Sequence, residues 1–178
     1  GALATELPDL DLFDETEPPP EDLFERAAAA EDAARAVTGI TNSEGAGASW
    51  SRGTVALAAS NGFAGAYTTS HHSVSASVLA GEGTAMERDY DYAVSRFAAD
   101  LEDAEAVGQR AGERAVRRLG PRKVATTEAP VVFDPRVADS LLRHLAGAAN
   151  GAAVARRTSF LRDRLQQPVF GGAISIID

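Results

Sequence analysis

The chain has 178 residues and no cysteine, a length that suits one ordinary domain and a composition that excludes disulfides, thiolate metal centres and thiol nucleophiles. Its net charge of -9 is concentrated in residues 1–32, which hold eleven acidic residues and one arginine, whereas the remainder holds 15 acidic and 16 basic residues. Because that remainder is nearly neutral, we expect no nucleic-acid partner. No apolar run reaches 18 residues, so we expect no membrane span.

Neither end of the chain has the features of a natural terminus. Residues 1–8 lack an initiating Met and the basic and apolar regions of a signal peptide, and the last residues stop within a β-branched apolar run. We therefore expect an internal fragment of a larger cytoplasmic protein.

The first 37 residues divide into a linker and a helix. Within the linker, which we place at residues 1–20, residues 6–20 alternate acidic with apolar residues and end in three prolines, which is typical of an extended segment. Residues 21–37 have apolar residues at three- and four-residue spacing with acidic residues in the first turn, which predicts an amphipathic helix.

Residues 40–82 are rich in Ser, Thr, Val and Gly, which predicts antiparallel strands at 46–51, 54–60, 63–70 and 73–80, with a fifth at 88–96. Arg52-Gly53 reads as a turn between the first two strands. Asn61-Gly62 predicts a type I′ hairpin turn, because both residues tolerate positive φ, and it places Phe63 and Tyr67 on one strand face.

The second half of the chain predicts two longer helices. Residues 101–119 share one apolar stripe and stop at Gly120-Pro121. Residues 131–133 read as a short buried strand, and Asp134-Pro135 begins a helix that continues to Val154 or as far as Arg164. The fold class is therefore α+β: an antiparallel meander of four to five strands flanked by helices, followed by the strand and long helix of a second unit. We place the domains at 1–20, 21–125 and 126–178.

Three groups of residues could carry chemistry but favour plainer interpretations. His71 and His72 are adjacent on a strand, so they point to opposite faces and cannot bind one metal together. Asp89 and Asp91 share a strand face that could hold a cation, yet the further oxygen ligands of a calcium loop are missing, so we expect a solvated face paired with Arg88 and Arg96. Ser159 lacks the surroundings of a nucleophilic serine.

The helix that contains His144 is the remaining candidate. A zinc-protease helix needs two histidines on one face with a glutamate between them. Here there is one histidine, and no acidic residue lies between Asp139 and Asp163. A packing or interface role for His144 is the interpretation that its chemistry favours.

Several separated motifs, in order along the chain, resemble the PmbA/TldD family. They are Thr38 to Ala46, Leu57 to Phe63, Gly81 to Tyr92, Pro130 to Pro135, Asn150 to Val154 and Ser159 to Leu161. The resemblance is closer to the PmbA branch, also called TldE. The TldD branch has His-Glu-x-x-x-His on the helix discussed above. On this alignment His144 keeps the first histidine, Leu145 replaces the glutamate and Ala149 replaces the second histidine.

The resemblance implies a cytoplasmic bacterial metalloprotease of two subunits, in which a TldD-like partner binds zinc and cleaves peptides or unfolded proteins for peptide maturation and antitoxin turnover. This chain would belong to the non-catalytic subunit. The candidates for contact with substrate or partner are Asn61, Gly62, Phe63, Tyr67 and Asn150.

Two alternatives stay open. One is a stand-alone metallopeptidase with unconventional ligands such as His71, His144 and Asp139. The other is an interaction module that binds DNA gyrase or another large protein through acidic residues 6–22, for which an interdomain linker is the plainer interpretation.

Overall fold

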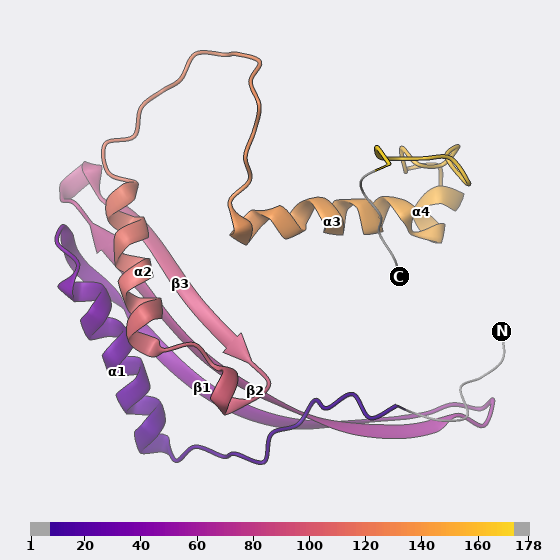
Figure 1. The fold of residues 1–178 in the computed structure, drawn as a ribbon, viewed down its shortest axis with the longest axis horizontal. Coiled ribbons are helices and arrows are strands. Elements are labelled where there is room, and N and C mark those ends of the chain that lie inside the picture. Colours follow the sequence, from indigo (N-terminus) through magenta and orange to yellow (C-terminus); the bar gives the residue numbers. More distant parts are fainter. Residues whose placement is uncertain (1–7, 173–178) are drawn as a thin grey trace. The chain divides into compact units, whose positions relative to one another are not determined.

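The computed structural model describes residues 8–172, and the chain divides after Lys123 into two compact units. The first unit contains a three-stranded antiparallel sheet and two helices, and the second contains helices and loops (Figure 1). The α+β prediction is confirmed. No helix among residues 8–172 is long and apolar enough to cross a membrane.

The sheet of the first unit has the strand order β1-β2-β3 (β1 Ile40–Ala58, β2 Ala64–Ala80, β3 Glu87–Ser95). Helices α1 (Pro20–Ala36) and α2 (Ala104–Arg117) pack against one face of it, and short 3-10 helices η1 (Gly83–Ala85) and η2 (Ala98–Asp100) lie at the ends of β3. Both long helices match the predicted ones within three residues at each end.

The prediction of four to five strands is wrong, because two pairs of predicted strands are continuous. Arg52 pairs with Ser70 and Gly53 with Thr69, so the supposed turn at Arg52-Gly53 lies within the ladder. A glycine in an extended strand loses side-chain packing but keeps both backbone hydrogen-bonding groups, so it does not have to end the strand.

The hairpin turn is also not of type I′. Gly62 has φ 93°, whereas Asn61 is absent from the residues with positive φ. The amide of Gly62 donates to the carbonyl of Ala59 at 3.0 Å, and that of Ala59 donates to the carbonyl of Phe63 at 2.9 Å. This is the three-residue loop in which a type I turn is followed by a left-handed glycine. The Asn61 side chain accepts the Phe63 amide at 3.2 Å, which favours this turn locally.

The core of the first unit consists of small residues, alanine and valine. Val74, Ala76, Val78 and Ala80 alternate along β2 and are buried under the two helices. The helices themselves approach closely: a Cβ added at Gly108 of α2 would lie 2.0 Å from the carbonyl oxygen of Ala30 in α1. This contact therefore requires a glycine at position 108.

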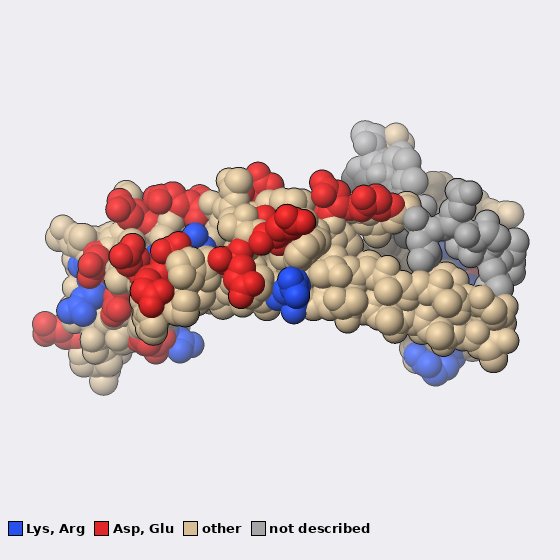
Figure 2. Space-filling model, turned by 90° about the horizontal axis from the view of Figure 1, so that it is seen from below, with Lys and Arg blue, Asp and Glu red and all other residues tan. Residues whose placement is uncertain are grey.

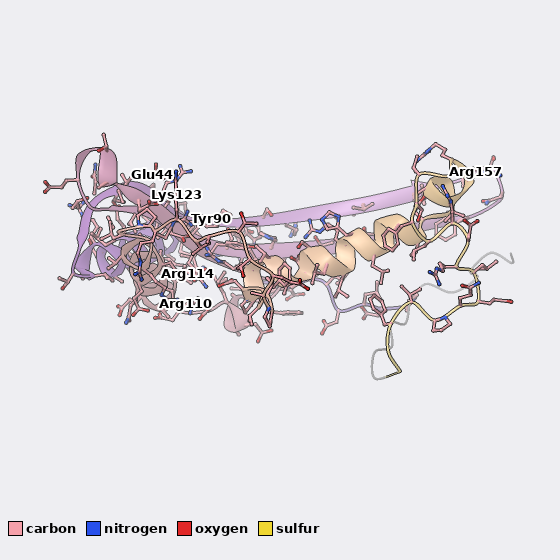
Figure 3. The ribbon with its side chains drawn as sticks, turned by 90° about the horizontal axis from the view of Figure 1, so that it is seen from above. Glu44, Tyr90, Arg110, Arg114, Lys123 and Arg157 are labelled. Atoms are coloured by element: carbon pink, nitrogen blue, oxygen red, sulfur yellow. The ribbon has the colours of Figure 1, made fainter. Side chains whose placement is uncertain are left out.

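Asp89 and Asp91 face the helices, which contradicts the prediction that they lie on a solvated face paired with Arg88 and Arg96. They are 6% and 5% exposed. Arg110 and Arg114 of α2 lie close to each other (Figure 3). Their side chains bind the Asp91 carboxylate, and Arg118, one turn further on, lies 3.5 Å from the Asp89 carboxylate. The aspartates can be buried because α2 supplies cations at four-residue spacing.

Residues 8–19, which we name the strap, form neither helix nor strand and are held on the first unit by hydrogen bonds of backbone and side-chain groups. Ser70 donates its amide to the Leu12 carbonyl at 3.0 Å. The Asp14 amide donates to Ser70 Oγ at 2.8 Å, and the Asp14 carboxylate accepts the Ala98 amide at 2.6 Å. This part of the expected linker is thus fixed at the sheet.

The second unit differs from the prediction in two ways. Residues 131–133 form no strand, and the long helix is broken: α3 spans Pro135–Ala149 and α4 spans Gly151–Ala155. Asn150 has extended backbone angles, and its side chain accepts the Ala152 amide at 2.9 Å. An Asn side chain that caps a new helix competes with continuation of the previous one.

Candidate functional site

The helix expected to carry a degenerate metal site is α3, in the second unit. His144 is exposed on it, and the side chains of Leu145 and Ala149 have no ligand atom. No group of three or more His, Asp or Glu side chains within residues 8–172 is arranged to hold a metal ion. The resemblance implies zinc in the TldD-like partner, and the single histidine of α3, with Leu145 and Ala149 at the other two positions, does not fit a zinc site within the described residues.

The unconventional ligands gain no support from the geometry. Asp139 Oδ2 accepts a hydrogen bond from Arg143 at 2.6 Å, one helical turn away. His71, His144 and Asp139 belong to no metal-binding group in the part of the chain that the structure describes.

Two polar residues of the second unit have structural roles. Asn150 caps α4, as described above. Ser159 is buried, its hydroxyl donates to the Ala148 carbonyl at 2.6 Å, and it accepts the Leu161 amide at 3.0 Å. A hydroxyl engaged in this way holds the loop after α4 against the end of α3.

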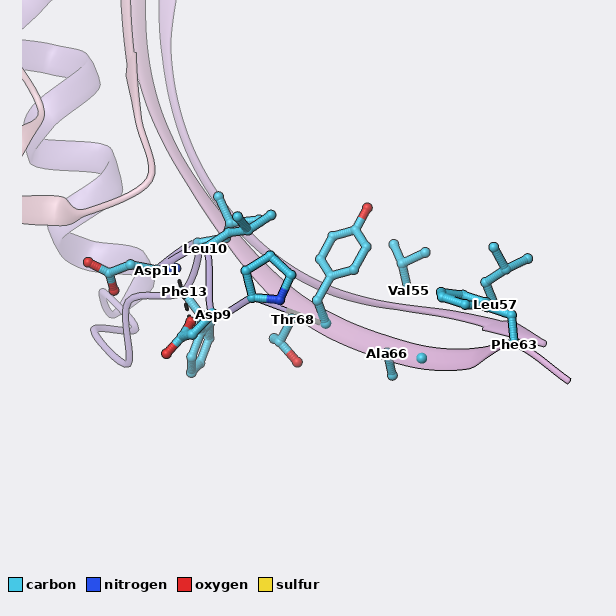
Figure 4. Close-up of a pocket in the computed structure, with 13 residues that line it drawn as sticks. Asp9, Leu10, Asp11, Phe13, Val55, Leu57, Phe63, Ala66 and Thr68 are labelled. Carbon is cyan, nitrogen blue, oxygen red and sulfur yellow. Dashed lines mark hydrogen bonds between the residues drawn. The ribbon is translucent and has the colours of Figure 1, made fainter. Parts of the chain in front are cut away.

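A concave site in the first unit lies between the strap and the outer half of the β1–β2 hairpin, which runs from Arg52 to its partner Ser70 around the turn (Figure 4). It is a groove of about 700 Å³. Phe63 and Tyr67, two of the candidates from the sequence, both line it, whereas Asn61 and Gly62 form the turn beside it. The other large apolar residues of its lining are Leu10, Leu12, Phe13, Val55 and Leu57.

Strand register explains why the hairpin presents apolar side chains here. Val55 pairs with Tyr67 and Leu57 with Gly65, so these side chains share one face of the ribbon. Val55, Leu57 and Tyr67 are 48%, 60% and 52% exposed. Sequence reasoning found Phe63 and Tyr67 but missed the strap residues, because the hydrogen bonds that hold the strap to Ser70 and Ala98 join positions at least 56 residues apart.

The groove is acidic at the strap. Asp9 and Asp11 line it, and no lysine or arginine does. Arg52 lies at the strap, where its guanidinium is 5.9 Å from the centre of the Phe13 ring. Figure 2, which views the side of the molecule that is lowest in Figure 1, shows many more acidic than basic side chains.

Beneath the anchored end of the strap lies a buried histidine. His72 is fully buried, its Nε2 lies 3.6 Å from Asp14 Oδ2, and neither ring nitrogen has a protein hydrogen-bond partner. Burial lowers the pKa of His72, an effect that the Asp14 carboxylate opposes. The Ala98 and Thr16 amides lower the pKa of Asp14. At neutral pH this pair is thus a neutral imidazole beside a carboxylate.

Comparison with known proteins shows the family to which the chain belongs. Two family models match, the PmbA/TldA metallopeptidase central domain at residues 13–119 and the C-terminal domain of the same metallopeptidases at residues 126–178. The chain belongs to the PmbA/TldD metallopeptidase family. Its similarity to Metalloprotease PmbA of Escherichia coli O157:H7 is 41% identity over 175 residues, which cover 98% of this chain and 39% of the relative.

Solved structures of this family share the fold. A protein described as a modulator of DNA gyrase from Bacteroides thetaiotaomicron is 29% identical, with a TM-score of 0.72, over 92% of this chain and 40% of the other. TldE from Thermococcus kodakarensis, at 16% identity, has a TM-score of 0.56 over 90% of this chain and 38% of its own. The chain thus spans about two fifths of the length of these PmbA/TldD relatives.

Proposed function

We propose that this chain is part of a non-catalytic, PmbA/TldE-type subunit that helps to hold peptide substrates for a zinc-binding, TldD-like partner. The observation that carries the proposal is that helix α3 keeps only one of the three residues of the His-Glu-x-x-x-His motif. His144 stands on α3 with Leu145 and Ala149 at the positions where the TldD branch has a glutamate and a second histidine, within a chain that otherwise matches the metallopeptidase family.

The uncovered half of the hairpin supports a role in holding an extended peptide. The Ser70 amide points away from β1, since it donates to the strap. Alternation along the strand places the amides of Thr68 and Ala66 at this same outer edge, and β3 has already ended where Ser95 pairs with His72. An extended peptide can add to such an edge through backbone hydrogen bonds.

The proposal is tested with the full-length protein and the paralogue of its host that has His-Glu-x-x-x-His. Each subunit is purified alone, and the two are also purified as a mixture. Zinc is then measured for each subunit, and cleavage of casein or of a short peptide is followed for each preparation. We expect cleavage only when both are present and zinc only in the paralogue. Cleavage by this protein alone, or stoichiometric zinc that His144→Ala abolishes, would contradict the proposal.

A further inference from the structure

The groove between the strap and the hairpin is an apolar surface that the first unit leaves open. Leu10 is 63% exposed, and Leu57 and Tyr67 expose more than half of their surface opposite it. Isolated β-ribbons are marginally stable in water, and apolar side chains gathered on one exposed face favour a further binding partner.

The groove is held open by fixed contacts. The hydrogen bonds of Leu12 and Asp14 to Ser70 anchor the strap at one end of the groove, and the guanidinium of Arg52 covers the Phe13 ring there. The opposite wall is set by the β1–β2 register. A ligand would therefore enter a site whose walls are already positioned, which lowers the entropic cost of binding.

The charge at the groove restricts which ligand it suits. The carboxylates of Asp9 and Asp11 line the strap side, and Arg52 is engaged with Phe13 at the anchored end. Asp9 Oδ1 accepts the Asp11 amide at 3.0 Å, which leaves its second oxygen as an acceptor. Apolar walls beside carboxylates suit an apolar side chain that has a cation next to it in sequence.

We infer that this groove binds an extended segment of another polypeptide in which large apolar side chains are flanked by lysine or arginine. The apolar side chains would lie against Val55, Leu57 and Tyr67, and the flanking cations would pair with Asp9 and Asp11. The inference rests on the proposed function in one respect, that the groove is occupied by a peptide. It adds which class of peptide binds there.

The test is direct binding of labelled peptides to the full chain, without the TldD-like partner, so that its outcome is separate from that of the cleavage assay. The probe is an eight-residue capped peptide with a Leu-Phe centre flanked by lysines. One matched peptide has glutamates in place of the lysines, and another has serines in place of Leu-Phe. We expect each replacement to weaken binding at least tenfold, and added salt to weaken binding of the lysine peptide.

Two variants locate the site. Leu57→Ser removes part of the apolar wall and should weaken binding at least fivefold. Its matched control is Val94→Ser on β3, which is 53% exposed but does not line the groove, and which should change binding less than twofold. Thermal melts of both variants show that each is folded.

A charge variant tests the carboxylates without touching the ribbon. Asp9→Asn with Asp11→Asn keeps the side-chain acceptors, and asparagine tolerates the positive φ of 49° at position 11. We expect about fivefold weaker binding and loss of the salt dependence. Equal binding of the lysine and glutamate peptides, equal effects of Leu57→Ser and Val94→Ser, or no measurable binding would each overturn the inference.

Discussion

The β1–β2 hairpin has two halves that differ in what covers them. In the inner half, alternate side chains of β2 from His72 to Ala80 are buried under α1 and α2. In the outer half, no residue from 51 to 62 is buried, and its main neighbour within the described chain is the strap. The same pair of strands is thus covered by helices at one end and offers an open surface at the other, so we expect the helix-covered part to contribute most of the stability.

The largest contrast is expected between one substitution in the helices that cover the inner half and one substitution in the outer half itself. Gly108→Ala would place a Cβ against the Ala30 carbonyl, force α1 and α2 apart and lower the free energy of unfolding by about 3 kcal/mol. Gly53→Ala adds a Cβ that meets nothing within 4 Å, and it should change the free energy of unfolding by less than about 0.5 kcal/mol. Denaturant titration measures both. Equal losses would show that the two halves are not energetically distinct.

Removing a buried carboxylate should have the next largest effect. Asp91→Asn weakens the ion pairs of this buried residue with Arg110 and Arg114. We expect the free energy of unfolding to fall by about 2 kcal/mol. The matched control is Glu44→Gln, since Glu44 pairs with Arg88 at 3.4 Å on the exposed face, where the loss should stay below about 1 kcal/mol. A cost of Asp91→Asn no greater than that of the control would contradict the scaffold role of α2.

The hairpin turn should respond more weakly and locally. Gly62→Val forces a β-branched residue to adopt φ 93° and should cost about 1–2 kcal/mol. Gly62→Asn is the control, because asparagine tolerates the left-handed region. If the Gly62→Val complex is folded, thermally weakened and still cleaves peptide at the normal rate, the hairpin is only scaffold and peptide addition at its edge is wrong.

The smallest expected effect is a pH dependence at the strap. Since burial lowers the pKa of His72 below its ordinary 6.5, the unfolded chain binds more protons, so stability falls as the pH drops below about 6.5. The charged groups that act on the ring are Asp14, Arg26 and His71. The Asp14 carboxylate has a lowered pKa, so the stability that it contributes is lost only at more acidic pH, below the ordinary aspartate pKa of 3.8. His72→Phe should flatten the slope between pH 7 and 5, and an unchanged slope would exclude His72 as its source.

Local patterns predicted much of the first unit. Alternation placed Val74 and Val78 on the buried face of β2, and three- and four-residue spacing located both helices. The errors arose where two local signals compete. Glycine at position 53 is compatible with both a turn and a strand, and the continuous β1–β2 pairing on both sides of it favours the strand. Carboxylates on one strand face suggested a solvated face at Asp89 and Asp91, whereas the arginines of α2 allow both aspartates to be buried.

The groove could be predicted only in part. Phe63 and Tyr67 follow from strand parity next to a recognisable turn. Asp9, Leu10 and Asp11 reach the groove because Asp14 and Leu12 bind groups near residues 70 and 98, and no local pattern reports contacts over such separations. In the second unit, Asn150 could have been recognised as a helix cap, since Asn followed by small residues is a common helix start.

Amide hydrogen exchange along β2, with and without the lysine-flanked peptide, tests most directly whether the hairpin is scaffold at one end and binding surface at the other. We expect residues 74 to 78 to exchange slowly in both conditions, because their exchange requires opening of the helix-covered core. Residues 64 to 68 should exchange rapidly alone and at least tenfold more slowly with peptide. Equal protection of the two segments without peptide, or no slowing of residues 64 to 68 with it, would contradict the account.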